Sequence, residues 1–597
     1  MNQQLTAIRT QLEKHNAHAY LLPRTDPHQS EYIPEYWEIL SWLSGFTGSA
    51  ANATITQDHA GVWTDSRYFI QGEQQLADSG FELMRLSVPH TTEYADWLAQ
   101  NLQPEQTVGL DGRLISRARF KQLERKLTAK QITINANLDL ITDLWSNRPA
   151  FPSKIILELL DQYSGKTRIE KIATLRKQMH ASNVTAHVIS SLDDIAWLLN
   201  VRGSDTEFTP LPTSYLFLDG ERIYWFIHQN RIPDALKKKL TEEGIELLPY
   251  DDIASFLKTL SGGSSVMIDP KRTSQWIVEA IPEDCTVVEA MNFTTASKSV
   301  KNDTEIRNIK EAMNRDGIAL VKFLIWLEES IGKETITEFS AATKLEAFRQ
   351  EQDDFVSPSF ATIASYEENG AIVHYRPSEE TALELHQQGL FLLDSGGQYL
   401  LGTTDITRTI NLYSGTATAQ EVRDFTLVLK GHIQLAMQQF PVGTKGYQLD
   451  VLARQALWNA GINYGHGTGH GVGYFLNVHE GPQSIGTGAT ANPNSAMKPG
   501  MLTSNEPGVY REGYYGIRIE NLMITVEKET TEFGNFLGFE TVSLCPIDQS
   551  LIDPTLLNLV EIEWLNDYHQ KVYDRLRPNL NEKETTWLAN QTNPIKI

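Results

Sequence analysis

Cysteine is nearly absent from this chain of 597 residues, which contains only Cys285 and Cys545. Two cysteines so far apart in sequence exclude a disulfide framework and a thiolate metal site. Long apolar runs are also missing, since no uncharged stretch approaches the roughly 20 residues needed to cross a bilayer. The N-terminal stretch MNQQLTAIRTQLEKHN lacks the apolar core of a signal peptide. We therefore expect a cytoplasmic protein that does not enter the membrane.

Basic residues are outnumbered, with 52 Lys and Arg against 75 Asp and Glu and a net charge of −23. Phosphate backbones are bound by clustered Lys and Arg, so nucleic acid is not an expected partner. A chain of this length exceeds what a single hydrophobic core supports, and several domains are expected.

Residues 1–151 alternate between helical and strand-like periodicity, which predicts an α/β domain. Two prolines in the stretch 148–152 interrupt regular pairing and predict a linker. The predicted segments are a helix whose apolar face carries Leu5, Ile8 and Leu12, a strand at Tyr20–Leu22, a strand at Gly61–Thr64, a helix over Ser116–Leu127 and a strand at Ile132–Asn135.

Residues 152–300 repeat this plan and predict a second α/β domain. A helix face marked by Ile169, Ile172, Leu175 and Met179 precedes a strand near Ala186–Ser190. The segment 41–49 also aligns without gaps on the segment 196–204 with four identities in nine positions. The alignment is short, but it favours a duplication.

Residues 301–597 are predicted to form the third domain, which ends in a helical extension. Asn302 with Glu305 has the pattern of a helix capping box, and Thr335 with Glu338 repeats it. Asp553-Pro554 is typical of a helix start. The apolar positions of this last helix are predicted to be core residues: Leu557, Val560, Trp564, Tyr568 and Leu576.

The stretch 389–521 concentrates side chains that bind hard metal ions or move protons. An ionised carboxylate is costly to bury unless it is paired or coordinates a metal, and each carboxylate here lies in or beside an apolar, strand-like run. Any one of them alone is better interpreted as an ordinary turn or rim residue. Together, in consecutive segments of one domain, they favour a common site. The residues are Asp394, Asp405, His466, His470, His479, Glu506 and Glu520.

His466 and His470 have the i, i+4 spacing of a zinc-binding helix, but glycines alternate with them at positions 465, 467, 469, 471 and 473. So many glycines make a helix unfavourable. We expect an extended segment in which the backbone approaches a ligand closely.

Arg518 and Glu520 lie two positions apart in a strand-like run and are predicted to share one face of it. A ligand set rich in oxygen with one imidazole suits Mn²⁺ or a related divalent ion. Carboxylates that outnumber imidazoles predict two ions bridged by shared carboxylates, about 3.5–4 Å apart, with one activated water.

The order Asp, Asp, His, Glu, Glu, with separations of 11 positions between the aspartates and 14 between the glutamates, resembles the pita-bread dinuclear metallopeptidases. The surrounding sequences AIVHYRP, DSGGQYLLGTTDITRT, HGTGHGVGYFLNVHEGP, NEPGVY and GIRIEN resemble the aminopeptidase P (X-prolyl aminopeptidase) family in its long, three-domain cytosolic form. The resemblance extends to WTDSRYF, IAWLLNVRGSD and LKGHI and covers nearly the whole chain. It implies two similar, creatinase-like α/β domains before an α+β pita-bread catalytic domain.

The resemblance also implies a role for each site residue. In this family Asp405 and Glu520 would bridge two metal ions, Asp394 would complete one ion's ligands, and His470 with Glu506 would complete the other's. Glu506 would also be the general base and acid, His479 the proton shuttle, and His466 the residue that steadies the tetrahedral intermediate. The residues implied around the substrate are His374, His466, Val478, His479, Tyr510 and Arg518.

The implied activity is hydrolysis of the bond between an N-terminal residue and a following proline, with two Mn²⁺ ions and a homodimer. Prolidase has the same five ligands, but the length of the chain and the WTDSRYF segment disfavour it. Creatinase-like enzymes use the fold without metal, and the complete carboxylate set disfavours them. A non-catalytic pita-bread binding or chaperone module would be expected to have lost ligands.

Overall fold

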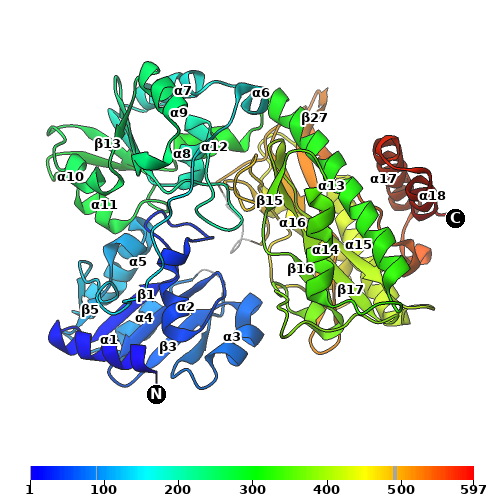
Figure 1. Cartoon of the computed structure of the whole chain (residues 1–597), viewed down its shortest axis with the longest axis horizontal. Helices are drawn as coiled ribbons and strands as arrows, with labels where there is room; N and C mark the ends of the chain where they lie inside the picture. The colour runs from blue at the N-terminus through cyan, green and yellow to red at the C-terminus, as the bar shows by residue number, and fades with distance from the viewer. Residues whose placement is uncertain (1, 89–90, 488–493, 597) are drawn as a thin grey trace. The chain divides into compact units, whose positions relative to one another are not determined.

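The computed structural model describes residues 2–88, 91–487 and 494–596, and in it the chain forms two compact units (Figure 1). Unit 1 comprises Met1–Leu160 and Lys166–Ala296, and unit 2 comprises Asp161–Gly165 and Ser297–Ile597. The domain boundaries predicted after residues 151 and 300 stay predictions. None of the helices in the described ranges combines the length and the apolar character that a membrane span requires.

Unit 1 contains two six-stranded sheets with the same strand order. The first runs β4-β3-β2-β1-β5-β6 and the second β12-β11-β10-β8-β13-β14. In the first, β1 pairs antiparallel with β2 and parallel with β5; its counterpart β8 pairs antiparallel with β10 and parallel with β13. The bounds are β1 Ala19–Pro23, β2 Ala51–Thr56, β3 Ala60–Thr64, β4 Glu82–Arg85, β5 Thr107–Gly109, β6 Thr133–Asn135, β8 Ala186–Ile189, β10 Tyr215–Asp219, β11 Ile223–Phe226, β12 Ile245–Leu248, β13 Ser265–Ile268 and β14 Thr286–Glu289.

Helices accompany both sheets of unit 1, and the predicted face of α1 is buried at Leu5, Ile8 and Leu12. One expected core position is wrong: Ile169 on α7 is 54% exposed. Its neighbour Arg168 is buried instead, because its guanidinium pairs with two glutamates. The helices are α1 Gln3–Lys14, α2 Ile39–Ser44, α3 Phe69–Leu76, α4 Glu93–Asn101, α5 Arg117–Thr128, α7 Arg168–Ala181, α8 Leu192–Leu199, α9 Asp234–Glu242, α10 Ile253–Leu257, α11 Gln275–Glu279 and α12 Phe293–Ser299, and two short strands, β7 Leu157–Glu158 and β9 Val201–Arg202, pair with each other.

The short sequence repeat falls on equivalent structure in the two halves of unit 1. It aligns the end of α2 with the end of α8, so that Gly45 corresponds to Asn200. Both residues stop their helix in the left-handed conformation, with φ of 81° and 49°. Glycine and asparagine are the residues that adopt this helix-ending conformation most readily. The predicted duplication of an α/β domain is confirmed by this match and by the identical strand order.

Unit 2 is α+β. The strand β17 (Leu390–Ser395) is the centre of the sheet β16-β17-β20, whose outer strands are Ile363–Tyr366 and Ile406–Asn411. The long helix α13 (Asp303–Ser330) and α14 (Glu338–Gln350) cover one face of this sheet, where they pack on side chains of β17. The remaining strands at this end are β15 Phe355–Pro358, β18 Gly397–Tyr399 and β19 Gly402–Thr403, and a short helix, α6, spans Asp161–Ser164.

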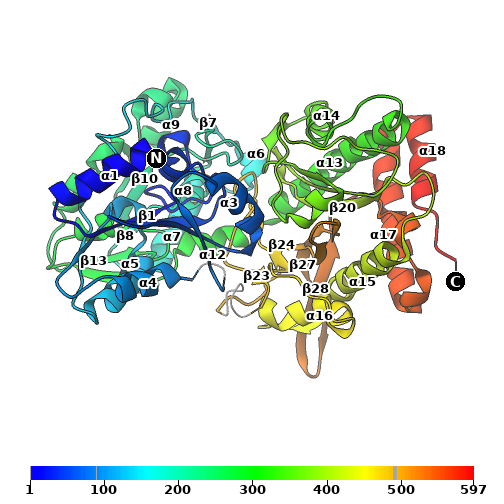
Figure 2. The same cartoon turned by 90° about the horizontal axis from the view of Figure 1, so that it is seen from below.

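The second half of unit 2 contains a four-stranded sheet of order β21-β28-β27-β24 and several short strand pairs. Helix α15 packs against α16 and against β25 and β26, and the C-terminal helices α17 and α18 lie beside α13 (Figure 2). The bounds are α15 Ala419–Ala436, β21 Phe440–Pro441, α16 Gly446–Asn459, β22 Gly469–His470, β23 Ser484–Ile485, β24 Leu502–Asn505, β25 Gly508–Arg511, β26 Tyr515–Arg518, β27 Asn521–Thr531, β28 Gly534–Thr541, α17 Leu559–Leu576 and α18 Glu582–Gln591.

Of the two helix caps predicted near the start of unit 2, one is confirmed and one is wrong. The capping box of Asn302 with Glu305 at α13 is confirmed. The cap predicted at Thr335 is wrong, because α14 is capped by Thr337 and begins at Glu338. The Glu338 carboxylate is buried and accepts hydrogen bonds from backbone amides of other segments, so it does not reach back to a cap.

The helix predicted at Asp553-Pro554 starts later than expected. Asp553 caps a short 3₁₀ turn at Pro554–Leu556, and α17 begins at Leu559 after its own cap, Asn558. Val560 was predicted to be core and is 55% exposed, because the buried face of α17 is formed by Ile562, Leu565 and Val572 instead.

The paired helix ends in unit 1 allow a test of backbone strain. Gly45→Ala should lower the free energy of unfolding by about 1–2 kcal/mol, the typical cost of a left-handed conformation for an L-residue. A Cβ at Gly45 would lie 3.7 Å from the Gln75 carbonyl oxygen, an ordinary contact, so the expected cost is strain alone. Gly45→Asn should cost less, since Asn200 occupies the equivalent position. Thermal unfolding of the full chain measures both, and equal losses for the two variants would contradict this explanation.

Candidate active site

Asp394 and Asp405 are brought together by the pairing of β17 with β20. Side chains alternate along β17, so Phe391 and Leu393 face α13 and α14 while Asp394 faces the opposite side. Asp394 is paired with Thr407 across the sheet. Asp405 lies two positions before Thr407 and therefore shares its face. Both carboxylates are buried.

Glu520 joins the same face from the gap between β26 and β27. Its backbone N–H donates to the Thr407 carbonyl at 3.1 Å, and its Oε2 accepts from the Thr407 hydroxyl at 2.8 Å. The predicted strand is interrupted here, because β26 ends at Arg518. Arg518 and Glu520 nevertheless share one face, since both contact the Thr407 hydroxyl, which accepts from Arg518 Nε at 3.3 Å and donates to Glu520.

His470 and Glu506 come from two neighbouring strands. His470 ends the short strand β22, so the extended conformation is confirmed and the helix is excluded. A Cβ on Gly469 would fall 2.0 Å from the Ser504 carbonyl oxygen, so glycine allows the two chains to approach. The Ser504 hydroxyl accepts from the His470 backbone N–H at 2.9 Å and donates to Glu506 Oε1 at 3.1 Å.

These side chains form one cluster. His470 Nε2 lies 3.5 Å from Asp405 Oδ2 and 3.4 Å from Glu506 Oε1. His470 Nδ1 is 3.1 Å from the Gly471 carbonyl, to which it donates, and this leaves Nε2 directed at the carboxylates. The ligand atoms of Asp405, His470 and Glu520 all lie within 4.8 Å of one another.

The carboxylates of the cluster repel one another, and this repulsion shifts their pKa values. Burial and the neighbouring Asp405 raise the pKa of Asp394 to about 6, although Arg518 lowers it. Burial and nearby carboxylates also raise the pKa of Glu506 and of Glu520. Burial lowers the pKa of His470, but Asp405 and Glu506 outweigh it and raise this pKa to about 9. The carboxylates therefore favour a proton or another cation among them.

The donor set fits divalent metal ions. Asp394 Oδ1 and Glu520 Oε1 are buried and have no hydrogen-bond partner among the described residues. Buried polar atoms are seldom left without one, and an ion that the structure does not include is a standard reason. Four carboxylates and one imidazole are the hard ligands that suit Mn²⁺ and related ions. The five predicted ligands, Asp394, Asp405, His470, Glu506 and Glu520, thus lie around this cluster.

A chain of hydrogen bonds leads from the cluster to His466. Arg518 donates to Asp394 with Nη2 and to the Tyr510 hydroxyl with Nη1, at 2.6 and 2.7 Å. The Tyr510 hydroxyl lies 2.8 Å from His466 Nε2, and His466 Nδ1 lies 2.7 Å from the Gly467 carbonyl. His466 is therefore oriented by contacts at both ring nitrogens.

The other predicted residues lie on adjacent or separate segments. The His479 ring is 4.3 Å from the His470 ring, centroid to centroid, and edge-on to it. Val478, before it, is buried. His374 lies on a separate segment, in the turn after the 3₁₀ helix η6 (Glu367–Ala371), where its neighbour Tyr375 donates to Glu338 at 2.8 Å.

Sequence reasoning missed two residues that orient ligands. Thr407 donates to Glu520, and Ser504 connects His470 with Glu506. Thr407 lies two positions after Asp405 and Ser504 two positions before Glu506. A period of two along a strand places such residues on the ligand's face, so the pattern contained the signal.

Family profiles match most of the chain. The profile of metallopeptidase family M24 matches residues 307–527, and the C-terminal region of that peptidase matches residues 535–595. Creatinase/prolidase N-terminal domain profiles match residues 4–139 and 147–305. The fold is therefore two creatinase-type N-terminal domains followed by the pita-bread domain, as predicted.

Curated relatives match over the full length. The chain is 39% identical to Xaa-Pro aminopeptidase 1 of Dictyostelium discoideum, over 100% of this chain and 97% of the relative. It is 39% identical to aminopeptidase P2 of Arabidopsis thaliana, over 97% of this chain and 86% of that protein.

Two solved structures share the fold of this chain over all or part of its length. The X-prolyl aminopeptidase of Caenorhabditis elegans, described as a cytosolic enzyme with a di-nuclear active site, superposes with a TM-score of 0.94 at 34% identity over 99% of both chains. An Xaa-Pro dipeptidase of Bacillus anthracis covers 64% of this chain and 99% of its own, with a TM-score of 0.50 at 23% identity, and shares the fold. Full-length relatives, matched profiles and the buried carboxylate cluster lead to one conclusion: the chain belongs to metallopeptidase family M24.

Proposed function

We propose that this chain is a metal-dependent aminopeptidase that hydrolyses the bond between an N-terminal residue and a following proline. The observation that carries this is the convergence of the Asp405, His470 and Glu520 ligand atoms within 4.8 Å, in a chain whose full-length relatives are named Xaa-Pro aminopeptidases. Prolidase is disfavoured, because the dipeptidase structure covers 64% of the chain and its likeness supports the fold alone.

The proposed cofactor is a pair of divalent ions, with Mn²⁺ as the assignment. Asp405 and Glu520 would be shared by both ions, Asp394 would complete one set of ligands, and His470 with Glu506 the other. Bound ions of this kind polarise a carbonyl and lower the pKa of a bound water. This suits the X-Pro bond, a tertiary amide without an N–H, because a site of this kind does not depend on holding that N–H. The partly unsatisfied oxygens of Asp394 and Glu520 support this assignment.

The chain's own groups would then move protons and hold charge. Glu506 is suited to accept a proton because burial and the neighbouring Asp405 raise its pKa above the usual value of a carboxyl group. His479, edge-on to His470, is suited to relay it. His466 is proposed to steady the developing negative charge, and its ring is oriented by contacts with the Tyr510 hydroxyl and the Gly467 carbonyl. Such proton transfers typically contribute 10²–10⁴-fold to the rate.

Proline recognition is proposed to come from His466, Val478 and Tyr510. Val478 is buried, and the Tyr510 and His466 rings lie edge to face with centroids 5.4 Å apart. Rigid apolar surfaces of this kind fit the pyrrolidine ring by shape. His374 and Arg518 complete the proposed substrate-binding set.

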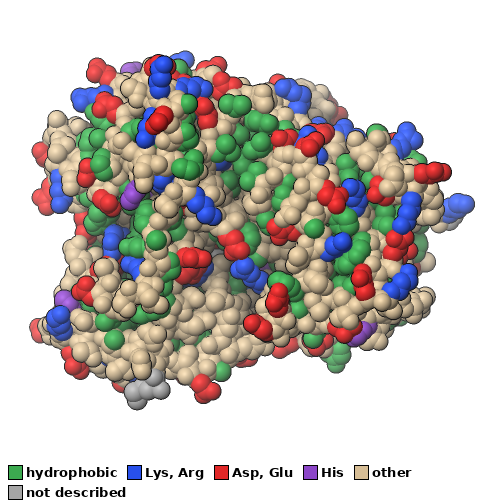
Figure 3. Space-filling view, in the orientation of Figure 1, with side chains coloured by type: hydrophobic (Ala, Val, Ile, Leu, Met, Phe, Trp, Pro, Cys, Tyr) green, Lys and Arg blue, Asp and Glu red, His purple; other side chains and the backbone are tan. Residues whose placement is uncertain are grey.

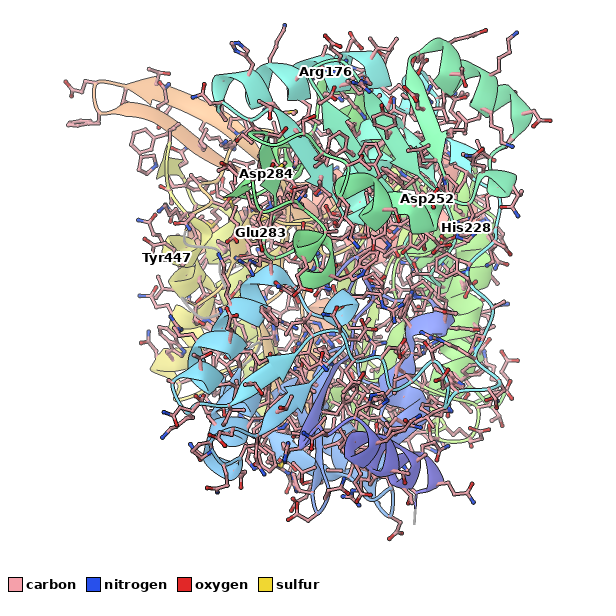
Figure 4. The ribbon with its side chains drawn as sticks, turned by 90° about the vertical axis from the view of Figure 1, so that its left-hand side faces the viewer. Arg176, His228, Asp252, Glu283, Asp284 and Tyr447 are labelled. Carbon is pink, nitrogen blue, oxygen red and sulfur yellow. The ribbon has the colours of Figure 1, made fainter. Side chains whose placement is uncertain are left out.

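Peptides with proline in the second position are the proposed partners, and a cytoplasmic location is proposed because the C. elegans relative is described as cytosolic. Acidic and basic side chains are interspersed on the face in Figure 3. The homodimer implied by the family stays a prediction. It has a candidate surface: Tyr447, Val451 and Trp458 form an exposed apolar stripe on α16, and Figure 4 labels Tyr447 there.

The metal assignment predicts about two Mn²⁺ per chain and a higher melting temperature on loading. Asp405→Asn should lower the metal content of both sites, because this carboxylate is proposed to be shared. Since the pKa of Asp394 is raised to about 6, protons should compete with the ions and affinity should fall as the pH drops below 6. Elemental analysis after dialysis measures this, with Asp553→Asn as the control, since Asp553 caps a 3₁₀ turn and is not among the proposed ligands. Full metal content in Asp405→Asn would overturn the assignment.

Glu506→Gln should keep the fold and lower kcat by about 10²–10⁴-fold, because the amide cannot accept the proton. Metal content is measured alongside turnover, so that loss of ions is separated from loss of the base. Far-UV circular dichroism and the melting temperature report the fold. A variant that yields no folded protein, or one that is folded, loaded and fully active, would refute the role of Glu506.

The substrate prediction is that the enzyme releases the first residue from X-Pro-Y peptides in strong preference to X-Ala-Y. The preference should be incomplete, about 10–200-fold, because small differences in an apolar pocket correspond to about 1–3 kcal/mol. Mass spectrometry on a mixture of X-Pro, X-Pro-Y and X-Ala-Y with Mn²⁺ present measures all three rates. Cleavage confined to X-Pro would indicate a prolidase, and no cleavage by the loaded protein would indicate a binding module.

A further inference from the structure

A second buried charge cluster lies in unit 2 beside the proposed active site. Glu480 is 1% exposed, and Lys298 and Lys301 are each 3% exposed. Lys301 Nζ donates to Glu480 Oε1 at 2.8 Å and to the Lys298 carbonyl at 3.1 Å, while Lys298 Nζ lies 3.7 Å from Glu480 Oε2. Two buried lysines thus converge on one buried glutamate. Buried charges are costly even when they are paired, so this arrangement calls for an explanation other than stability.

Glu480 lies next to the backbone segments that carry two histidines of the site, His470 and His479. It directly follows His479 in sequence, and its backbone N–H donates to the Gly471 carbonyl at 2.7 Å, one residue after His470. This backbone hydrogen bond therefore joins the two segments that carry His470 and His479, whose rings lie 4.3 Å apart.

The packing around Glu480 leaves little room for adjustment. A Cβ on Gly471 would fall 2.1 Å from the Glu480 carbonyl oxygen, and a Cβ on Gly473 would fall 2.8 Å from Glu480 Oε2. The glycines after His470 therefore let the loop close tightly on Glu480. A shift of the Glu480 side chain would be transmitted to the backbone that carries both histidines.

The two lysines belong to the segment that enters unit 2. Lys298 lies in the last turn of α12, and Lys301 directly precedes Asn302, the cap of α13. Within unit 1, Thr295 on the same short helix donates to Asp194 at 2.9 Å. Within unit 2, the Lys301 backbone N–H donates to the Gly500 carbonyl at 2.9 Å. The segment is thus anchored at both ends.

We propose that Glu480 is a positioning residue, which the buried Lys298 and Lys301 hold so that His479 stays against His470 in the geometry that proton relay needs. The inference rests on the proposed aminopeptidase function. On this proposal, Lys298 and Lys301 support catalysis indirectly, through Glu480. Neither lysine is among the proposed metal ligands or substrate-binding residues.

The test compares Glu480→Gln with Glu561→Gln. Glu561 is a matched control, because it is also 1% exposed and also accepts from a lysine, Lys430, at 2.8 Å, between α15 and α17. Both variants are loaded with Mn²⁺, and turnover of an X-Pro-Y peptide is normalised to metal content. We expect Glu480→Gln to lower kcat at least 10-fold with KM within threefold, since small misplacements of catalytic groups cost rate more than binding. Glu561→Gln should leave both within twofold.

Two substitutions of Lys301 distinguish a role of its charge in positioning Glu480 from a role of its side chain in packing. Lys301→Gln should reproduce the loss of kcat, and Lys301→Arg, which keeps the charge, should recover most of it. If Glu480→Gln does not fold, Lys298→Gln at the longer 3.7 Å contact provides the milder test, with an expected threefold or greater loss of kcat. Wild-type kcat in folded, loaded Glu480→Gln or Lys298→Gln would overturn the proposal, as would a loss that follows metal content alone. An inactive wild type would instead count against the proposed function.

Discussion

Mutual repulsion among buried carboxylates is the constraint around which unit 2 is organised. Asp394, Asp405 and Glu520 are buried, and Glu506, whose side chain is 18% exposed, meets them from the end of another strand. The protein offsets part of this with Arg518 against Asp394 and with hydroxyl donors from Thr407 and Ser504. The remaining repulsion favours bound cations, which is the physical basis of the proposed metal centre.

The scaffold holds the backbone around the ligands as firmly as it holds their side chains. The buried Arg408 donates to the carbonyls of Thr407 and Glu520, both at 2.8 Å, and to the Cys545 carbonyl and the Tyr568 hydroxyl at 2.7 and 2.8 Å. One guanidinium therefore joins a strand next to Asp405, the gap that carries Glu520 and the C-terminal helix α17. The helical extension contributes to ligand geometry through these bonds, at a distance from the chemistry.

Local patterns predicted much of this arrangement. Period-two alternation correctly placed Asp394 on a buried strand and Arg518 with Glu520 on one face, where both contact Thr407. The glycines correctly excluded a zinc helix. The failures were also local. Thr335 with Glu338 and Asp553-Pro554 match helix-start patterns, but a buried role for Glu338 and a separate 3₁₀ turn decided those starts. Tertiary contacts override capping propensities of about 1 kcal/mol.

The sequence by itself determined the duplicated α/β plan, the five candidate ligands and their family, because these depend on residue types at fixed separations along the chain. Only the tertiary structure decided which ligand atoms meet, that Arg518 occupies one oxygen of Asp394, and that Lys298 and Lys301 converge on Glu480. Lys301 and Glu480 are 179 positions apart, and nothing in the chemistry of either residue alone indicates the other. Long-range pairs of this kind form only when strands and helices pack. Sequence patterns with a period of a few residues therefore do not predict them.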